Sequence, residues 1–148
     1  MTTTDNTPQD VSESLRQFSG FGWVKHLGLE IQEATGDGLR ASWTITPEHH
    51  QPYGIVHGGV HCTVIETVAS LSGGTWFGDR GQVVGVSNQT DFLRATREGV
   101  LTAVSTPVHR GRLQQLWLVE IRDGDDRLVS RGQVRLQNIA SADALGRA

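Results

Sequence analysis

One segment of this chain, QPYGIVHGGVHCTVIETVAS at residues 51–70, limits the possible folds more than any other. Its apolar positions recur at helical spacing, namely Val60, Val64, Val68 and Leu71. β-Branched residues such as Thr63 and Ile65 are poor helix formers, so the prediction of a helix rests on spacing and not on propensity. The glycine pair at its start and Gly73-Gly74 after it are typical of helix ends. We therefore expect a helix of about 15 residues that begins near Gly59 and is buried on most sides.

Alternating apolar and polar residues predict strands on both sides of that helix. The segment LEIQEATGDGLRASWTI, residues 29–45, is typical of a hairpin. Four strand-like runs follow the helix: VVGVSNQTDFL, VLTAVSTPVH, LQQLWLVEIR and LVSRGQVRLQN. This order predicts an α+β fold in which a six-stranded antiparallel sheet curls around one central helix. Exposed Trp and Leu on the outer face of the sheet would favour association with a second copy.

The chain has 148 residues, of which 36% are hydrophobic, and this suits one domain with a real core. We divide it into an N-terminal tail with a short helix at residues 1–20, the main domain at 21–138 and a C-terminal tail at 139–148. The first dozen residues are mostly polar, so we expect them to bury little and to be disordered.

Composition and motifs exclude several classes of function. The net charge is −3 with both signs interspersed, which argues against a nucleic-acid partner. No apolar run approaches the ~20 residues that span a membrane, and the N-terminus lacks the apolar core of a signal peptide. A single cysteine, Cys62, allows no internal disulfide. We expect a cytoplasmic protein without a membrane partner. Neither a nucleophile elbow, a phosphate loop nor a dinucleotide fingerprint is present.

Glu66 is the sharpest chemical feature, because it is the one acid within the apolar helical segment. It lies two turns from Gly59 on the same helix face, and Ser70 lies one turn further. A carboxylate on a buried helix needs a partner or a cavity, so a functional cleft competes here with a Glu that simply reaches solvent.

His57-Gly58-Gly59 precedes the helix. Glycines allow a ligand to approach the backbone, and the free N–H groups of a helix N-terminus attract negative charge. The arrangement is typical of an oxyanion site for acyl transfer, although a plain turn has the same pattern. Gln51 could orient water or a carbonyl, or be solvated.

A metal site is an open alternative. His57 and His61 are four residues apart, and with Glu66 or His109 they could bind zinc. His57 is expected to precede the helix, where the pair would not converge, so we predict no metal. Cys62 suits a small core residue better than a nucleophile. Basic residues in FLRATR and HRGR are either solvated loop charges or the mouth of a site for a phosphate-bearing ligand.

Three segments together, QPYGIVHGGVHCTVIETVAS, VVGVSNQTDFLRA and HRGRLQQLWLVEI, resemble the hotdog-fold acyl-CoA thioesterases over roughly residues 22–138. The chain is most similar to the phenylacetate-degradation and 4-hydroxybenzoyl-CoA thioesterase type, and it also resembles the 1,4-dihydroxy-2-naphthoyl-CoA hydrolases. The resemblance implies a curled sheet around one helix, active sites at a dimer interface, and homodimers paired into homotetramers. It implies an acyl-CoA substrate and no further cofactor.

The resemblance also implies roles for individual residues. Glu66 matches the catalytic nucleophile or general base, and Gly58 the backbone N–H that polarises the thioester carbonyl. His57 and Gln51 match groups that line the site, and Ser70 a hydroxyl that orients water. The matched coenzyme A segments are Gly85, Phe92, Leu93, Arg94 and Ala95, followed by His109, Arg110, Gly111, Arg112, Leu113 and Gln114. Phe92 stands where some relatives have His, which puts one polar contact in doubt.

The predicted reaction is hydrolysis of an aromatic or medium-chain acyl-CoA. Trp23, Tyr53, Trp76 and Phe77 could shape the acyl pocket. A thiolate is a fair leaving group, so one carboxylate and one amide suffice without a metal. The alternatives are a hydratase or dehydratase acting on acyl thioesters, a non-catalytic acyl-CoA binding module, and a metal-dependent hydrolase.

Overall fold

The computed structural model describes residues 9–140 and contains one six-stranded sheet and one long helix. The helices and 3-10 turns are α1 (Ser12–Arg16), η1 (Gln17–Gly20), α2 (Gly22–Leu27), η2 (Pro47–His49), α3 (Gly58–Phe77) and η3 (Gly78–Arg80). The strands are β1 (Glu30–Thr35), β2 (Gly38–Thr44), β3 (Gln82–Phe92), β4 (Val100–Arg110), β5 (Gln114–Arg122) and β6 (Leu128–Ile139).

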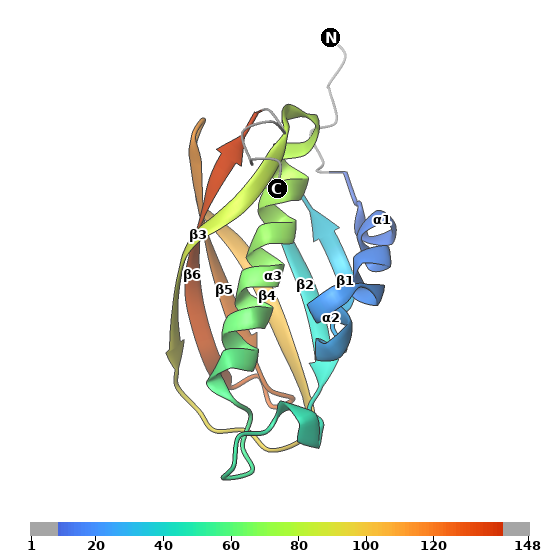
Figure 1. Ribbon diagram of the computed structural model, residues 1–148, viewed down its shortest axis with the longest axis vertical. Helices are drawn as coiled ribbons and strands as arrows, with labels where there is room; N and C mark the ends of the chain where they lie inside the picture. The colour runs from blue at the N-terminus through green and yellow to red at the C-terminus, as the bar shows by residue number, and fades with distance from the viewer. Residues whose placement is uncertain (1–8, 141–148) are drawn as a thin grey trace.

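The strands form an antiparallel sheet in the order β1-β2-β4-β5-β6-β3, and α3 crosses its concave face (Figure 1). The predicted α+β architecture, a sheet curled around one helix, is therefore confirmed. No helix within residues 9–140 is both long enough and apolar enough to cross a membrane.

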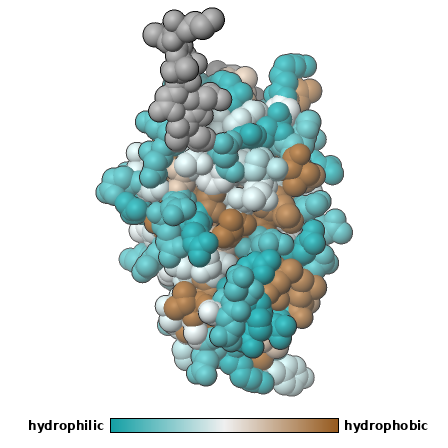
Figure 2. Space-filling view, turned by 180° about the vertical axis from the view of Figure 1, so that it is seen from behind, coloured by the Kyte–Doolittle hydropathy of each residue, from teal (hydrophilic) through white to brown (hydrophobic). Residues whose placement is uncertain are grey.

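Alternate residues of the strands pack against α3 and form the core. Val64, Ile65 and Val68 of the helix are fully buried against Trp117 of β5 and Trp43 of β2, which are 0% and 2% exposed. The expectation that Trp side chains lie on the outer face of the sheet was therefore wrong, because both strand tryptophans fill the space under the helix. The outer face instead carries scattered apolar patches between polar ones (Figure 2).

Helix α3 is longer than predicted, because Gly73 and Gly74 lie within it and do not end it. A Cβ on Gly73 would lie 2.2 Å from Leu136 Cδ1 and 2.9 Å from the Gln115 side-chain oxygen. Gln115 is itself fully buried and donates to the Gly73 carbonyl and to Asn138 Oδ1. Gly73 is thus the position where the helix backbone touches the sheet, which a terminal glycine would not do.

The segment before the domain is more ordered than predicted. Ser12 is 4% exposed, and its hydroxyl accepts a hydrogen bond from the Ala34 N–H at 2.7 Å. The Val11 N–H donates to the Ala34 carbonyl at 2.9 Å. Both bonds hold α1 beside β1, so the prediction of disorder was wrong for residues 11–12. Residues 1–8, which the same prediction covers, lie outside the described residues. So do residues 141–148, which make up most of the predicted C-terminal tail.

The contact at Gly73 generates a stability prediction. Gly73→Ala should lower the free energy of unfolding by about 1–3 kcal/mol, because the new methyl group overlaps Leu136 in a packed core. Gly74→Ala is the matched control: its Cβ would meet only Val83 Cγ2 at 3.9 Å, so helix propensity should leave stability unchanged or raised by up to about 1 kcal/mol. Urea unfolding of both variants measures the difference, and equal stability would contradict the packing role.

Candidate active site

The Glu66 side chain lies between α3 and β3, half-buried. Gly85 of β3 makes room for it, since a Cβ at that position would lie 1.9 Å from Glu66 Oε1. The other oxygen, Oε2, accepts a hydrogen bond from the Asn88 side-chain amide at 3.1 Å. The carboxylate is therefore held against the backbone of an edge strand. Ser70 lies one turn further along α3 and is also half-buried.

Asn88 was not among the predicted site residues. A polar residue on a strand-like run carries no signal of its own, and only the packing of β3 on α3 brings it to Glu66. Gly85 was predicted as a coenzyme contact, and the structure places it directly beside the carboxylate.

His57 caps the N-terminus of α3, as expected for a residue that precedes the helix. Its Nδ1 accepts a hydrogen bond from the Gly59 N–H at 2.8 Å, which places the proton of the neutral ring on Nε2. The Val60 N–H donates to the His57 carbonyl. The Gly58 N–H has no acceptor among the described residues, so this first-turn amide is available to a ligand.

A cavity of about 330 Å³ opens at this helix end, lined by Gln51, Ile55, Val56, Gly58, His61, Phe92, Leu93, Arg94 and Ala95. The Phe92 ring lies over Gly58, because a Cβ there would be 3.0 Å from the ring. Gln51 accepts a hydrogen bond from the Tyr53 N–H through its side-chain oxygen, which leaves its NH₂ group as a donor. The structure thus brings together six predicted site residues from two separate segments.

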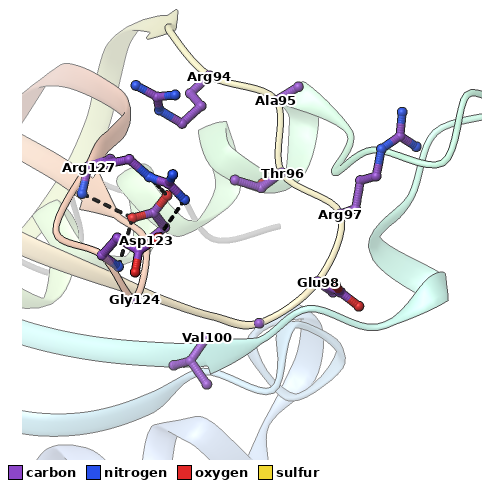
Figure 3. Close-up of a pocket in the computed structure, with 11 residues that line it drawn as sticks. Arg94, Ala95, Thr96, Arg97, Glu98, Val100, Asp123, Gly124 and Arg127 are labelled. Carbon is purple, nitrogen blue, oxygen red and sulfur yellow. Dashed lines mark hydrogen bonds and ion pairs between the residues drawn. The ribbon is translucent and has the colours of Figure 1, made fainter.

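Arg97 holds the loop before α3 in place. Its guanidinium donates to the carbonyls of Tyr53 and Gly54 at 3.1 and 3.0 Å. From the same loop, His50 Nε2 donates a hydrogen bond to the backbone carbonyl of Arg97 at 2.7 Å. Figure 3 shows the Arg97 side chain pointing toward this loop and away from the neighbouring hollow. Of the two arginines in FLRATR, Arg97 is engaged within the chain.

Arg94 lies on the rim of a second hollow, of about 410 Å³, beside the turn between β5 and β6 (Figure 3). Asp123 and Arg127 form an ion pair on the opposite wall, with 2.8 Å between Arg127 Nε and Asp123 Oδ2. Arg94 has no ion-pair partner among residues 9–140.

The second predicted coenzyme segment surrounds a hollow at the opposite end of the sheet. His109, Gly111, Arg112, Leu113 and Gln114 line this hollow of about 510 Å³. Arg110 points elsewhere: it donates to the Gly36 carbonyl and pairs with Asp37 at 2.7 Å. One chain therefore does not bring the two predicted coenzyme segments together.

The aromatic residues proposed for the acyl pocket are also dispersed. Tyr53 is 84% exposed in the loop before α3, and Trp23 is 63% exposed on α2. Trp76 and Phe77 lie at the far end of α3, where Arg80 stacks over both rings.

His61 is buried in the wall of the cavity at the helix N-terminus, 4% exposed. Its Nδ1 lies 3.2 Å from Ser130 Oγ, and the rings of Trp43 and Phe92 flank it. Burial lowers the pKa of His61 from 6.5 to about 4. Within the described part of the chain, no three His, Cys, Asp or Glu side chains lie close enough to bind a metal ion.

Comparisons with known proteins identify relatives of this chain. The family model described as "Thioesterase superfamily" matches residues 53–130. A Mycobacterium tuberculosis protein called an esterase is 50% identical over 116 residues, covering 76% of this chain and 83% of that protein. The proofreading thioesterase EntH of Cronobacter turicensis is 34% identical over 115 residues, covering 78% and 84%. The crystal structure of a Haemophilus influenzae thioesterase superposes with a TM-score of 0.81 at 33% identity, covering 86% of this chain and 89% of that one.

The buried imidazole predicts a pH-dependent stability. The folded pKa of His61, about 4, lies below the unfolded value of 6.5, so the unfolded chain binds the extra proton between these values. Stability from this group is complete above pH 6.5 and falls as the pH is lowered toward 4, by up to about 3 kcal/mol. In His61→Gln the decline over this window should be smaller by that amount. Urea unfolding at several pH values measures it, and an identical pH dependence in both proteins would contradict the assignment.

Proposed function

The chain belongs to the thioesterase superfamily and is a thioester hydrolase, and we propose that it hydrolyses an acyl-CoA to the free acid and coenzyme A with Glu66 as its catalytic carboxylate. The observation that carries this proposal is the placement of Glu66, whose carboxylate lies against the bare backbone at Gly85 and accepts a hydrogen bond from Asn88. The glycine leaves room for the carboxylate beside the strand, and the amide orients it there.

The proposed chemistry needs two groups. The Gly58 N–H donates a hydrogen bond to the thioester oxygen as negative charge develops on it, and this N–H is free to do so because it donates to no residue among 9–140. Glu66 either attacks the carbonyl carbon or takes the proton of an attacking water. If Glu66 attacks, the C–S bond breaks and leaves a mixed anhydride of the acyl group with Glu66, which water then hydrolyses to the free acid. If Glu66 takes the proton of water, the tetrahedral adduct of that water collapses with cleavage of the C–S bond. In both routes the coenzyme A thiolate leaves and takes up a proton released by the water. Gln51 and Ser70 would orient the water or the carbonyl.

The two groups are too far apart within one chain. Glu66 follows Gly58 by eight residues, which corresponds to about 12 Å along a helix. Phe92 of β3 lies beside Gly58, and Asn88 of β3 lies beside Glu66. These two strand residues are four positions, or about 13 Å, apart along β3. One carbonyl requires an amide and a carboxylate each within roughly 3–3.5 Å of its own atoms. We therefore infer that the site takes its amide from the partner subunit.

The edge strand β3 supports this dimer. It has 11 residues, lies at one end of the strand order and exposes Val86 and Phe92 by 53% and 57%. A long exposed edge of this kind is a template for pairing. If two β3 strands pair antiparallel about a two-fold axis that passes near Thr90, Asn88 beside Glu66 in one chain lies opposite Phe92 beside Gly58 in the other.

The same pairing would join the two basic segments. Arg94 follows β3 at one end of the sheet, and Arg112 lies in the β4–β5 turn at the other end. Antiparallel association brings the Arg94 end of one chain toward the Arg112 end of its partner. Together they would offer guanidinium groups to the phosphates of coenzyme A.

A thiol-release assay over a panel of aromatic and aliphatic acyl-CoAs tests the function. The wild type should release free thiol, and Glu66→Gln should lower kcat by about 10²–10⁴-fold, because the amide can neither attack nor take a proton. The variant should keep the thermal midpoint of the wild type and its affinity for coenzyme A. Equal turnover by the wild type and Glu66→Gln would contradict the proposal.

Mixed dimers test the shared site. Gly58→Pro removes the N–H at a helix position that tolerates proline, and should lower kcat by about 10²–10³-fold. Gly58→Ala is the control, since it meets Phe92 with the same Cβ but keeps the N–H. Dimers that combine a Gly58→Pro chain with a Glu66→Ala chain contain one intact site, so they should recover about half of the wild-type rate. If each chain supplied both groups, the mixed dimer would stay inactive.

A further inference from the structure

A β-bulge in β3 determines which side chains face Glu66. The register between β3 and β6 shifts between Gly85 and Ser87, so Val86 is an extra residue. In a regular strand Gly85 and Asn88, three positions apart, would face opposite sides of the sheet. The bulge reverses the alternation, and both residues face α3: Gly85 under Glu66 Oε1 and Asn88 beside Oε2.

Asn88 makes three hydrogen bonds that fix its side chain. Its Nδ2 donates to Glu66 Oε2 and to the Cys62 carbonyl, each at 3.1 Å. Its Oδ1 accepts from the Thr90 hydroxyl at 2.7 Å. Because the carboxylate and the carbonyl can only accept, they require the NH₂ group on the α3 side, and the Thr90 hydroxyl supports that orientation by donating to Oδ1.

The other carboxylate oxygen of Glu66 has no hydrogen-bond donor within residues 9–140. Glu66 Oε1 lies over Gly85 and receives no hydrogen bond from residues 9–140. No charged side chain within residues 9–140 makes a hydrogen bond or an ion pair with Glu66. Within residues 9–140, the amide of Asn88 is therefore the one group that donates a hydrogen bond to the carboxylate.

We propose that Asn88 is a positioning residue for catalysis: its amide, oriented by Thr90 and brought to α3 by the bulge at Val86, holds Glu66 Oε2 so that Oε1 meets the thioester carbonyl or the attacking water. The inference rests on the proposed function of Glu66. Asn88 acts through Glu66 and need not touch the substrate, so it governs kcat and not the binding of acyl-CoA.

Two variants and one control test this role in the thiol-release assay. Asn88→Ala should lower kcat by about 10- to 100-fold, the range for a hydrogen bond to a charged group, with KM changed by less than about twofold. Thr90→Val keeps the shape of the side chain but removes the hydroxyl, and should lower kcat by about threefold with the same unchanged KM. Gln89→Ala should behave as wild type, because Gln89 lies on the other face of β3 beside Arg131 and Gln133.

Asn88→Asp supplies a readout that a merely structural role would not move. At low pH the two carboxyl groups share one proton, and a protonated Asp can donate to Glu66 as Asn88 does. At higher pH both ionise and repel each other. The kcat/KM of Asn88→Asp should therefore fall with rising pH over a range in which the wild type and Asn88→Ala stay level.

The outcomes separate the two proposals. Suppose that Glu66→Gln is inactive, that Asn88→Ala keeps the wild-type kcat, and that the kcat/KM of Asn88→Asp does not fall with rising pH. The role of Asn88 is then overturned, and that of Glu66 stands. If Glu66→Gln hydrolyses as well as the wild type, both are overturned. A loss of activity in Asn88→Ala that is accompanied by a matching loss of thermal stability, with Thr90→Val unaffected, would also overturn the positioning role.

Discussion

The close approach of the Glu66 carboxylate to the backbone of β3 is the contact on which the site depends. It places an ionisable group at a helix–strand interface where only a hydrogen atom at Gly85 can be tolerated. A buried or half-buried carboxylate is stable only with a donor nearby, and Asn88 supplies one from the same strand. The packing of α3 on the sheet and the bulge in β3 can be understood as the conditions for this contact.

The core holds α3 at the required height and rotation. Gly73 lets the helix backbone touch Leu136 and Gln115, and the buried amide of Gln115 ties the helix to the strands through the Gly73 carbonyl. A polar network that is fully satisfied specifies one arrangement, whereas apolar contacts alone permit the helix to slide. Precise placement of a carboxylate by a helix needs such a fixed point in the core.

Several groups that look like ligand contacts in the sequence serve the protein itself. Arg97 holds the loop before α3, and Arg110 holds the β1–β2 turn through Asp37. Their neighbours Arg94 and Arg112 make no ion pair in the part of the chain that the structure describes. The basic segments thus divide into residues that hold a loop or a turn of the protein and residues that form no ion pair within residues 9–140.

Periodicity by itself determined the main features of this protein. The alternation in six runs and the one apolar helical segment predicted the order of elements, because burial of one face leaves a local pattern in the sequence. His57, Gly58 and Glu66 could also be selected, since their spacing follows from the helix. Local patterns could not reveal that α3 continues through Gly73, or that a bulge brings Asn88 beside Glu66. Those facts depend on contacts between residues distant in the chain, and only the tertiary packing of helix and sheet decides them.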